Sequence, residues 1–351
     1  MALDLDIDRI RRLVGEGVRD KVYPGAVWAV GDRSNMAIGT PGVLDPDRPD
    51  EPMRHDTVFD VAGLTEILAV WSSVGCLVED GRLHLDEHLG DFWSEVRGHP
   101  LGRVNTRHLL THTAGLPLHT DLGNRYGTHP RDIRNGVLRE AVRRPPGEAV
   151  EYTDRAALVL GYLAEDLSGQ SLDTLAATGV WQPLGMTRTC YGPLPDEAAA
   201  RCAPTELDDI TGVRLRGTTP CPSAHLLGGV RGSSGVFSVL PDLAAFLRHL
   251  LQPKQDGGGG QPGFGPAWVQ ESLRIRTGDL TPAGGLLWHP APGTGPGTDD
   301  IWVHHGTTGA AAFLSPKQGR WAVLLTNELY YARDHGPLGH VRDAFRSLAF
   351  A

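Results

Sequence analysis

The sequence predicts a protein of the α/β (α+β) class with a long apolar helix at its centre. Three stretches carry this prediction. Residues 5–20 place Leu, Ile and Val at helical spacing, residues 26–30 form an apolar strand-like run, and residues 64–80 are apolar on nearly every face. A helix with so little polar surface is typically buried. We therefore expect residues 64–80 to be central to the core.

The other elements follow in chain order. Pro24-Gly25 opens the first strand, a second strand is expected over 36–39, and a loop rich in Pro and Asp runs to Pro52. Gly81 is expected to end the central helix, because a left-handed glycine commonly follows the last helical turn. Two stretches rich in Gly and Pro, 256–266 and 291–298, have the composition of surface loops.

Composition narrows the class of protein. The 351 residues carry a formal net charge of −9 without a basic run, so nucleic acid is not an expected partner. No apolar run approaches the roughly 20 residues of a membrane helix. The first residues lack a basic region followed by an apolar one, so we expect no secretory signal. The four scattered cysteines do not suggest a disulfide framework. We expect a cytoplasmic protein that binds a small molecule, with no membrane partner and an oligomeric state left open.

One motif organises the chain. Residues 57–66 read Thr-Val-Phe-Asp-Val-Ala-Gly-Leu-Thr-Glu and open the apolar helix. This block resembles the first motif of the penicillin-binding-protein-like serine hydrolases, which include class C β-lactamases, D-Ala-D-Ala peptidases and related esterases. Their motif reads Thr-Val-Phe-x-x-Ala-Ser-x-Thr-Lys, in which the Ser is acylated and the Lys takes its proton. In this chain Gly63 stands at the Ser position and Glu66 at the Lys position.

These two replacements change the chemistry that the motif can support. Residues three apart share one helix face, which is why a nucleophile and its base can exchange a proton there. Gly63 has no side chain to acylate, and Glu66 is an acid where the family has a cation. None of the three lysines, Lys21, Lys254 and Lys317, follows a Ser or Thr by three residues, so the chain holds no shifted copy of the motif.

Further blocks match the family in the same order. They are residues 104–117, 146–169, 184–186 and 224–251. By this resemblance the fold is an antiparallel sheet flanked by helices and built from both chain ends, with a mostly helical lobe inserted. We expect the sheet lobe in residues 1–60 and 226–351 and the helical lobe in 61–225. The active-site cleft is expected between the two lobes.

The resemblance also places residues in the cleft. The family's Tyr-x-Asn motif is Tyr152-Thr153-Asp154 here, which keeps the Tyr as a proton-transfer partner and replaces an amide by a carboxylate. The third motif, Lys-Thr-Gly or His-x-Gly, is His304-His305-Gly306. Side chains alternate along a strand, so one of the two histidines should face the cleft. There it could act as a general acid or base, and the alternative is a hydrogen-bonded histidine within the strand.

The expected site residues follow from these matches. The catalytic candidates are Glu66, Tyr152 and His304. The substrate-binding candidates are Gly63, Thr65, Asp154, His305, Gly306 and Thr307. The alternative is that Tyr152 is simply a buried aromatic side chain.

Other reactive side chains are expected to have structural roles. His112 lies in a block kept for packing, and Cys221, between two prolines, is expected to be a small buried residue without a base. His84 and His88, like His108 and His112, are spaced four apart, but neither pair has an HExxH pattern or a third ligand at fixed spacing. We expect no metal and no cofactor.

The leading hypothesis is a repurposed enzyme. Glu66, Tyr152, Asp154 and His304 would surround the space left by the missing Ser side chain. Such a site cannot form the acyl-enzyme of the family. It can still bind a small organic molecule and move protons, as an isomerase, cyclase, lyase or water-activating hydrolase does. A cytoplasmic location fits the tailoring of a small metabolite in natural-product biosynthesis.

Two alternatives stay open. The first is a pseudoenzyme, in which the fold binds a small molecule or a partner without turnover. The second is an esterase with a substitute nucleophile, for which Thr65 is the nearest hydroxyl. A conventional serine β-lactamase or D-Ala-D-Ala peptidase is not expected. The substrate and the reaction type cannot be chosen from the sequence.

Overall fold

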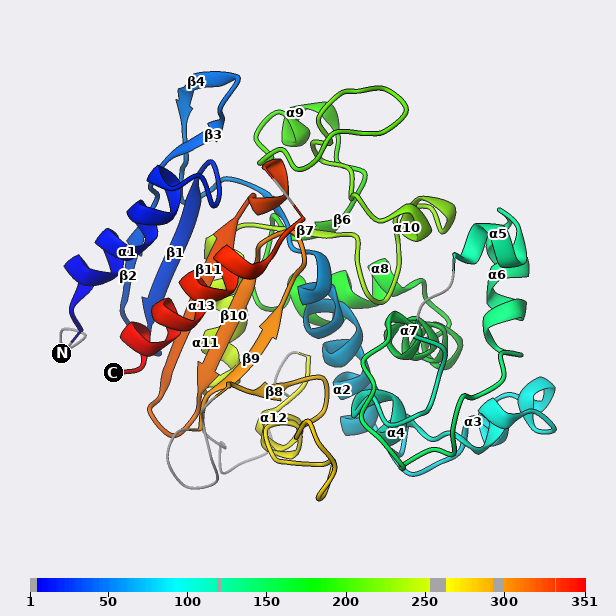
Figure 1. Ribbon diagram of the computed structural model, residues 1–351. Coiled ribbons are helices and arrows are strands. Elements are labelled where there is room, and N and C mark those ends of the chain that lie inside the picture. The colour runs from blue at the N-terminus through cyan, green and yellow to red at the C-terminus, as the bar shows by residue number, and fades with distance from the viewer. Residues whose placement is uncertain (1–4, 119–120, 253–262, 293–299, 332) are drawn as a thin grey trace.

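A six-stranded antiparallel sheet, in the order β2-β1-β11-β10-β9-β8, is the main layer of the fold (Figure 1). The computed structural model describes residues 5–118, 121–252, 263–292, 300–331 and 333–351. The strands are β1 (Ala26–Gly31), β2 (Met36–Gly39), β8 (His289–Pro290), β9 (Trp302–His305), β10 (Ala311–Ser315) and β11 (Arg320–Thr326). The register pairs Ala26 with Thr326. Both ends of the chain therefore meet in one sheet, and the predicted fold class is confirmed.

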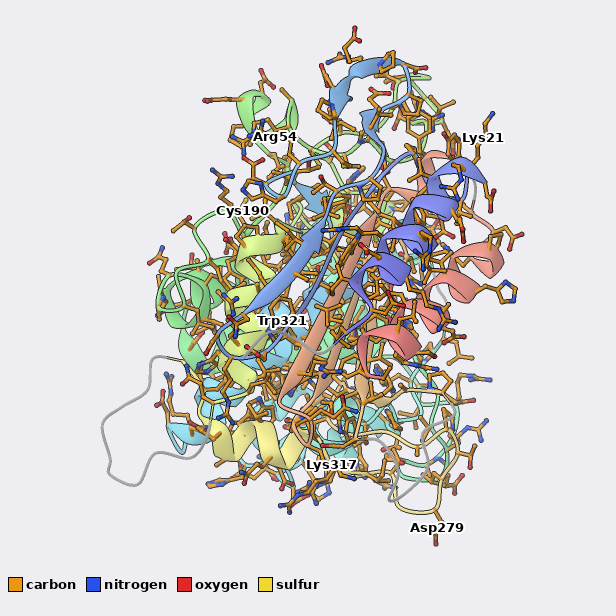
Figure 2. All side chains as sticks on the ribbon, turned by 90° about the vertical axis from the view of Figure 1, so that its left-hand side faces the viewer. Lys21, Arg54, Cys190, Asp279, Lys317 and Trp321 are labelled. Atoms are coloured by element: carbon orange, nitrogen blue, oxygen red, sulfur yellow. The ribbon has the colours of Figure 1, made fainter. Side chains whose placement is uncertain are left out.

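Helices cover both faces of this sheet. On one face α1 (Ile7–Arg19) packs against α13 (Gly336–Ala349), and on the other α11 (Leu240–Leu250) packs against β1 and β11 (Figure 2). The α1–α13 face is closed by apolar side chains, including an edge-on contact between Trp28 and Phe345 with ring centroids 6.4 Å apart. The larger apolar core lies on the α11 face, between the sheet and the helical part of the chain.

The predicted central helix is present and irregular. It begins as a short 3-10 turn, Ala62–Leu64, widens into a π-helical stretch, Glu66–Trp71, and continues as α2 (Ser72–Glu79). Gly81 follows with φ +68°, as expected for a glycine that ends a helix. The 18 residues from Ala62 are apolar enough to pass the length and composition test for a membrane helix, and 78% of them are buried inside the fold.

The π-helical stretch is stabilised by side chains from elsewhere. A wide turn leaves backbone carbonyls without their usual helical partner. The Leu68 carbonyl accepts hydrogen bonds from Ser72 Oγ at 2.7 Å and from Trp181 Nε1 at 2.8 Å. Trp71 donates its own Nε1–H to Ser272 Oγ at 2.9 Å. The irregular start of this helix is therefore built into the core, and it sets the direction of Glu66.

The remaining helices and strands complete the helical part and its edges. The helices are α3 (Leu89–Phe92), α4 (Thr106–Leu110), α5 (Leu122–Tyr126), α6 (Pro130–Val137), α7 (Asp154–Ser168), α8 (Leu172–Ala176), α9 (Asp196–Ala199), α10 (Pro222–Leu226) and α12 (Pro266–Ser272). Short 3-10 turns cover Ser94–Val96, Pro100–Arg103 and Glu328–Tyr330, and Ala177–Trp181 forms a second π-helical turn. The small strands are β3 (Val43–Asp45), β4 (Arg48–Pro52), β5 (Phe59–Asp60), β6 (Cys190–Tyr191) and β7 (Val236–Ser238).

One of the predicted loops contains a β-hairpin in the structure. The stretch before Pro52 was expected to be a loop, and it instead holds the β3–β4 hairpin, whose polar residues pair through the backbone. The predicted loops at 256–266 and 291–298 lie largely outside the described residues, although Pro266 begins α12. The sheet β5-β7-β6 joins residues on both sides of the proposed lobe boundaries. The boundaries at 60 and 226 stay a prediction.

A buried ion pair anchors the start of α7. Arg155 Nε lies 3.0 Å from Glu140 Oε2, and the two side chains are only 4% and 1% exposed. Tyr126 donates its hydroxyl to the other carboxylate oxygen, Oε1, at 2.7 Å. Thr153 caps the helix by accepting from the Arg155 N–H, and it donates to the Pro117 carbonyl at 2.6 Å. These contacts fix the position of the residues that lead into α7, including Tyr152.

Candidate active site

Gly63 lies under the end of strand β9. A Cβ atom built on Gly63 would be 2.5 Å from the His305 carbonyl oxygen, and one built on Gly306 would be 2.3 Å from the Val61 carbonyl oxygen. The two glycines therefore allow the helix start and the strand end to approach closely. The expected space for a Ser side chain is absent, because the backbone carbonyl of His305 occupies it. This corrects the expectation from sequence.

The segment after β9 is held in place from the other face of the sheet. Arg342 of α13 donates Nη2 hydrogen bonds to the Gly306 carbonyl at 2.9 Å and to the Ala310 carbonyl at 3.0 Å. Thr308 donates its hydroxyl to the Asp60 carbonyl at 2.6 Å. The carbonyl above Gly63 is thus part of a fixed turn.

Replacing Gly63 with Ala is expected to lower the free energy of unfolding by about 1–3 kcal/mol, as overpacking of a well-filled core does. The new methyl group would collide with a backbone oxygen that cannot rotate away. Gly339 of α13 is the matched control, because a Cβ there meets nothing within 4 Å. Gly339→Ala should leave stability unchanged or raise it by up to about 1 kcal/mol. Urea unfolding measures the stability of both variants. Equal stability of Gly63→Ala and wild type would show that the turn can move to make room for the methyl group.

Glu66 is fully buried next to two proton-carrying groups. Its side chain is 0% exposed, and Tyr152 donates its hydroxyl to Glu66 Oε1 at 2.8 Å. The second oxygen, Oε2, lies 3.6 Å from His304 Nε2 and has no hydrogen-bond partner among the described residues. The three candidate catalytic residues of the sequence are therefore adjacent in space, in the order Tyr152, Glu66, His304.

His304 faces Glu66 in a defined tautomer. Its ring is 3% exposed, and Nδ1 lies 2.7 Å from the Leu287 carbonyl oxygen. A carbonyl only accepts, so Nδ1 carries the hydrogen and Nε2 of the neutral ring presents a lone pair toward Glu66. Burial, with a smaller contribution from His289, lowers the pKa of His304 to about 4. The imidazole is thus neutral near pH 7 and able to accept a proton.

The pKa of Glu66 is shifted in the opposite direction, upward. Burial, reinforced by the nearby Asp154 carboxylate, raises the pKa of Glu66 to about 8, while the hydrogen bond from Tyr152 and the Arg231 charge oppose this rise. Near neutrality the carboxyl therefore holds a proton that His304 lacks. An acid and a base whose pKa values are driven apart by burial are a common arrangement in acid–base sites.

The raised pKa of Glu66 predicts a pH-dependent stability. Above pH 4.5 the unfolded chain releases a proton that the folded protein keeps, so the contribution of Glu66 to stability is lost as the pH rises to about 8. Glu66→Gln lacks this loss, and its stability relative to wild type should rise across that window by a few kcal/mol, at about 1.4 kcal/mol per pKa unit. Urea unfolding at several pH values measures the difference. A difference independent of pH would contradict the assignment.

Tyr152 connects this buried pair to solvent. Its side chain is 51% exposed, although its hydroxyl points to Glu66, and the hydroxyl also lies 3.4 Å from Asp154 Oδ1. The side chain of Asp154 is 45% exposed, and its other oxygen accepts from Arg231 Nη2 at 2.9 Å. Arg231 is itself buried, with Nη1 3.1 Å from Cys221 Sγ. The site thus contains a guanidinium that the sequence motifs did not indicate.

Three imidazoles stack along one side of the site. The His112 ring lies 4.8 Å from the Tyr152 ring and 6.0 Å from the His289 ring, and His289 lies 6.1 Å from His304, all as centroid distances. Both ring nitrogens of His112 are buried without a partner among the described residues. Burial lowers the pKa of His112 to about 3. His112, expected to be structural, therefore borders the candidate site.

The remaining candidates are divided between the site and its surroundings. Thr65 is fully buried, and its hydroxyl accepts from the Val236 N–H at 3.2 Å. The His305 ring lies on the α13 face, 5.9 Å from the Phe313 ring as a centroid distance, so only its carbonyl reaches Gly63. Thr307 is exposed at the turn. The described residues contain no group of three His, Cys, Asp or Glu side chains arranged to hold a metal ion.

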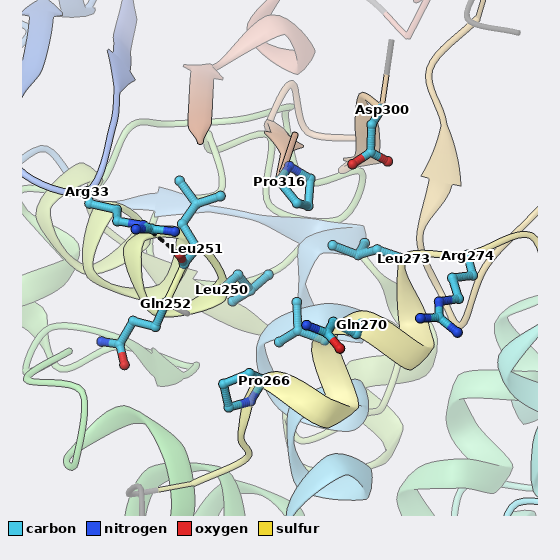
Figure 3. A pocket seen from close by; sticks show the side chains of 11 residues that line it. Arg33, Leu250, Leu251, Gln252, Pro266, Gln270, Leu273, Arg274, Asp300 and Pro316 are labelled. Atoms are coloured by element: carbon cyan, nitrogen blue, oxygen red, sulfur yellow. Dashed lines mark hydrogen bonds between the residues drawn. The ribbon is translucent and has the colours of Figure 1, made fainter. Parts of the chain in front are cut away.

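Several hollows of the described surface lie away from this group of residues. Figure 3 shows one of about 310 Å³ between the end of α11 and α12. Arg33 lies at its edge and donates Nε to the Leu251 carbonyl at 2.7 Å. No residue that lines this cavity belongs to the group around Glu66. The cleft between the two lobes stays a prediction.

Comparison with known proteins agrees with this fold. Residues 10–344 match the family described as Beta-lactamase. The chain belongs to the β-lactamase family. A relative in Escherichia coli K12, named "Putative D-alanyl-D-alanine carboxypeptidase", is 25% identical over 319 residues, which cover 78% of this chain and 69% of the relative.

Solved structures of several other proteins superpose over almost the whole chain. A class C β-lactamase from Rhodobacter sphaeroides gives a TM-score of 0.76 at 18% identity, covering 97% of this chain and 99% of that one. SurE gives 0.75 at 23% identity, covering 97% and 75%. A mutant of simvastatin synthase from Aspergillus terreus gives 0.73 at 19% identity, covering 97% and 93%. At these identities the likeness establishes the fold.

Proposed function

We propose that this protein is a repurposed member of the β-lactamase family that moves protons on a small organic metabolite without forming an acyl-enzyme. Gly63 stands at the nucleophile position of the family motif, and the space above it is filled by the His305 carbonyl. Thr65, the nearest hydroxyl, is buried and engaged with Val236. Neither feature supports covalent catalysis.

The observation that carries this proposal is the line of proton-carrying groups from Tyr152 through Glu66 to His304. When a substrate gives a proton to Tyr152 Oη, the tyrosine passes its own hydrogen to Glu66 Oε1, at 2.8 Å. Glu66 then passes the proton on Oε2 to His304 Nε2 once these two atoms, 3.6 Å apart here, close to hydrogen-bond distance. Each group gains one proton and loses one until His304 becomes the imidazolium. The reverse sequence delivers a proton to the product.

The surroundings of this relay favour the return of the proton from His304 to Glu66, because burial lowers the pKa of the imidazolium and raises that of the carboxyl. The Leu287 carbonyl accepts from Nδ1 and so favours the imidazolium when it forms. Asp154, half-exposed beside Tyr152, is positioned to contact the substrate together with Tyr152. Isomerases, cyclases, lyases and water-activating hydrolases all use such acid–base transfer. One structural relative, named simvastatin synthase, supports a reaction in the biosynthesis of a small organic molecule.

The proposal is tested first by the absence of acylation. The protein is incubated with a fluorescent penicillin and examined by denaturing gel and intact mass. We expect no adduct, and a stoichiometric adduct at any residue would overturn the non-covalent mechanism. Candidate metabolites, chosen from the products of neighbouring genes, are then incubated in heavy water, where proton transfer appears as deuterium in the recovered molecule.

A binding module without turnover is the second candidate. The observation that favours it is the same carbonyl above Gly63, because a filled nucleophile position is also expected in a protein that has lost catalysis. Tyr152→Phe separates the two candidates. A ligand that binds wild type and Tyr152→Phe alike, and takes up deuterium with neither, identifies a binding module. Deuterium uptake with wild type that Tyr152→Phe abolishes identifies an enzyme.

A further inference from the structure

A basic cavity lies next to the segment that leads into Tyr152. It has a volume of about 550 Å³ and is lined by Arg97, Arg103, Arg143, Arg144 and His99, with three prolines, a valine and a glycine forming the rest of its wall. No carboxylate belongs to its lining. Four guanidinium groups in one cavity stand out in a chain whose net charge is −9. Such a gathering of like charges is costly unless an anion accompanies it.

The arginines retain donors for a ligand. Arg143 and Arg144 share one carboxylate oxygen, Glu151 Oε1, at 3.1 and 2.9 Å, and their side chains are 44% and 38% exposed. Arg97 uses its Nε for the Gly90 carbonyl at 3.2 Å. Arg103 is exposed and has no partner among the described residues. Since each guanidinium has five N–H donors, most of the donors in this cavity are uncommitted.

We propose that this cavity binds a small organic phosphate. The paired N–H groups of an arginine match two oxygens of a phosphate group. Four arginines also carry more positive charge than a single carboxylate neutralises. The volume lies in the range of small-molecule sites, and Pro100, Pro145 and Pro146 provide an apolar wall for the organic part. Arg97 and Arg103 would contact the ligand on one side, and Arg143 and Arg144 would contact it on the other.

Glu151 is the internal competitor of such a ligand. Its carboxylate neutralises only one of the four charges, and its N–H donates to the His112 carbonyl at 2.8 Å. Removing the charge of Glu151 frees Arg143 and Arg144 for the phosphate. Binding at this cavity needs no turnover, so it is measured independently of the proposed function.

Inorganic pyrophosphate is the probe, titrated into the full chain by calorimetry at fixed ionic strength. We expect saturable binding of one equivalent, weakened at least tenfold in Arg97→Ala and in Arg103→Ala, which are surface changes that preserve the fold. Arg131→Ala removes an exposed arginine of α6 outside the cavity and should bind like wild type. Glu151→Gln should bind more tightly, by several-fold.

Two results would overturn the proposal. One is the absence of saturable pyrophosphate binding, with melting curves confirming that the protein is folded. The other is an equal loss of affinity in Arg103→Ala and Arg131→Ala, which would mean that the anion follows overall charge. Tighter binding of a nucleoside diphosphate than of pyrophosphate supports an organic phosphate, and equal affinity would contradict a role for the apolar wall.

Discussion

Replacing Glu66 with Gln is expected to slow proton transfer by about 10²–10⁴-fold, the usual contribution of a positioned acid or base. Gln keeps the size of Glu and can still accept the hydrogen bond from Tyr152, but it cannot pass a proton to His304. Ligand affinity should change far less, because Glu66 is fully buried beneath Tyr152. The effect should therefore appear in kcat rather than KM. Steady-state rates, or deuterium uptake per unit time, measure it.

Glu165→Gln is the matched control for this variant. Glu165 lies in α7, and burial also raises its pKa, but its carboxylate accepts from the Leu172 N–H and stands outside the relay. Its removal should leave turnover within about twofold of wild type, as expected when the group does not touch the transition state. Wild-type turnover in Glu66→Gln would remove Glu66 from the mechanism and leave Tyr152 and His304 to explain it.

Replacing Glu140 with Ala is expected to lower the free energy of unfolding by about 3–5 kcal/mol, the loss typical when one partner of a buried ion pair is removed. Arg155 would keep its charge at a site where its side chain is 4% exposed, and Tyr126 would lose its acceptor. Denaturant unfolding followed by circular dichroism measures the change. Because these residues anchor the start of α7, the fluorescence or resonance of Tyr152 should change as well.

The surface pair of Arg11 and Asp8 supplies the comparison. These side chains are 61% and 76% exposed, so Asp8→Ala should cost less than about 1 kcal/mol. Similar losses of unfolding free energy in Asp8→Ala and Glu140→Ala would mean that burial does not increase the contribution of the Arg155–Glu140 pair to stability.

The sequence could predict the features that depend on local pattern. Alternation along β9 required the two histidines to face opposite sides, and the structure places His304 toward Glu66 and the His305 ring toward Phe313. The left-handed Gly81 was expected from its position after the apolar run. The motif spacing brought Glu66 and Tyr152 together, although 86 residues separate them.

The rest of the site depends on contacts that leave no local pattern. Arg231 and His289 reach the site from segments whose sequences have no helical or strand periodicity. His112 lies in a sequence block that was interpreted as structural, so its place beside the site was not predicted. The carbonyl above Gly63 is a backbone group, so its position cannot be predicted from the residue types in the sequence. The π-helical start of the central helix likewise arises from tertiary hydrogen bonds, such as the one from Trp181 to Leu68.

The fixed turn above Gly63 also has a bearing on ancestry. Some Gly codons differ from a Ser codon by one base, and from those codons a single base change places serine at position 63. Its side chain would enter a space that the His305 carbonyl fills, and Arg342 holds the next residues in place from the far face of the sheet. The turn has to be remodelled before serine can be accommodated. Any series of mutations that introduces serine at position 63 must therefore change the turn first.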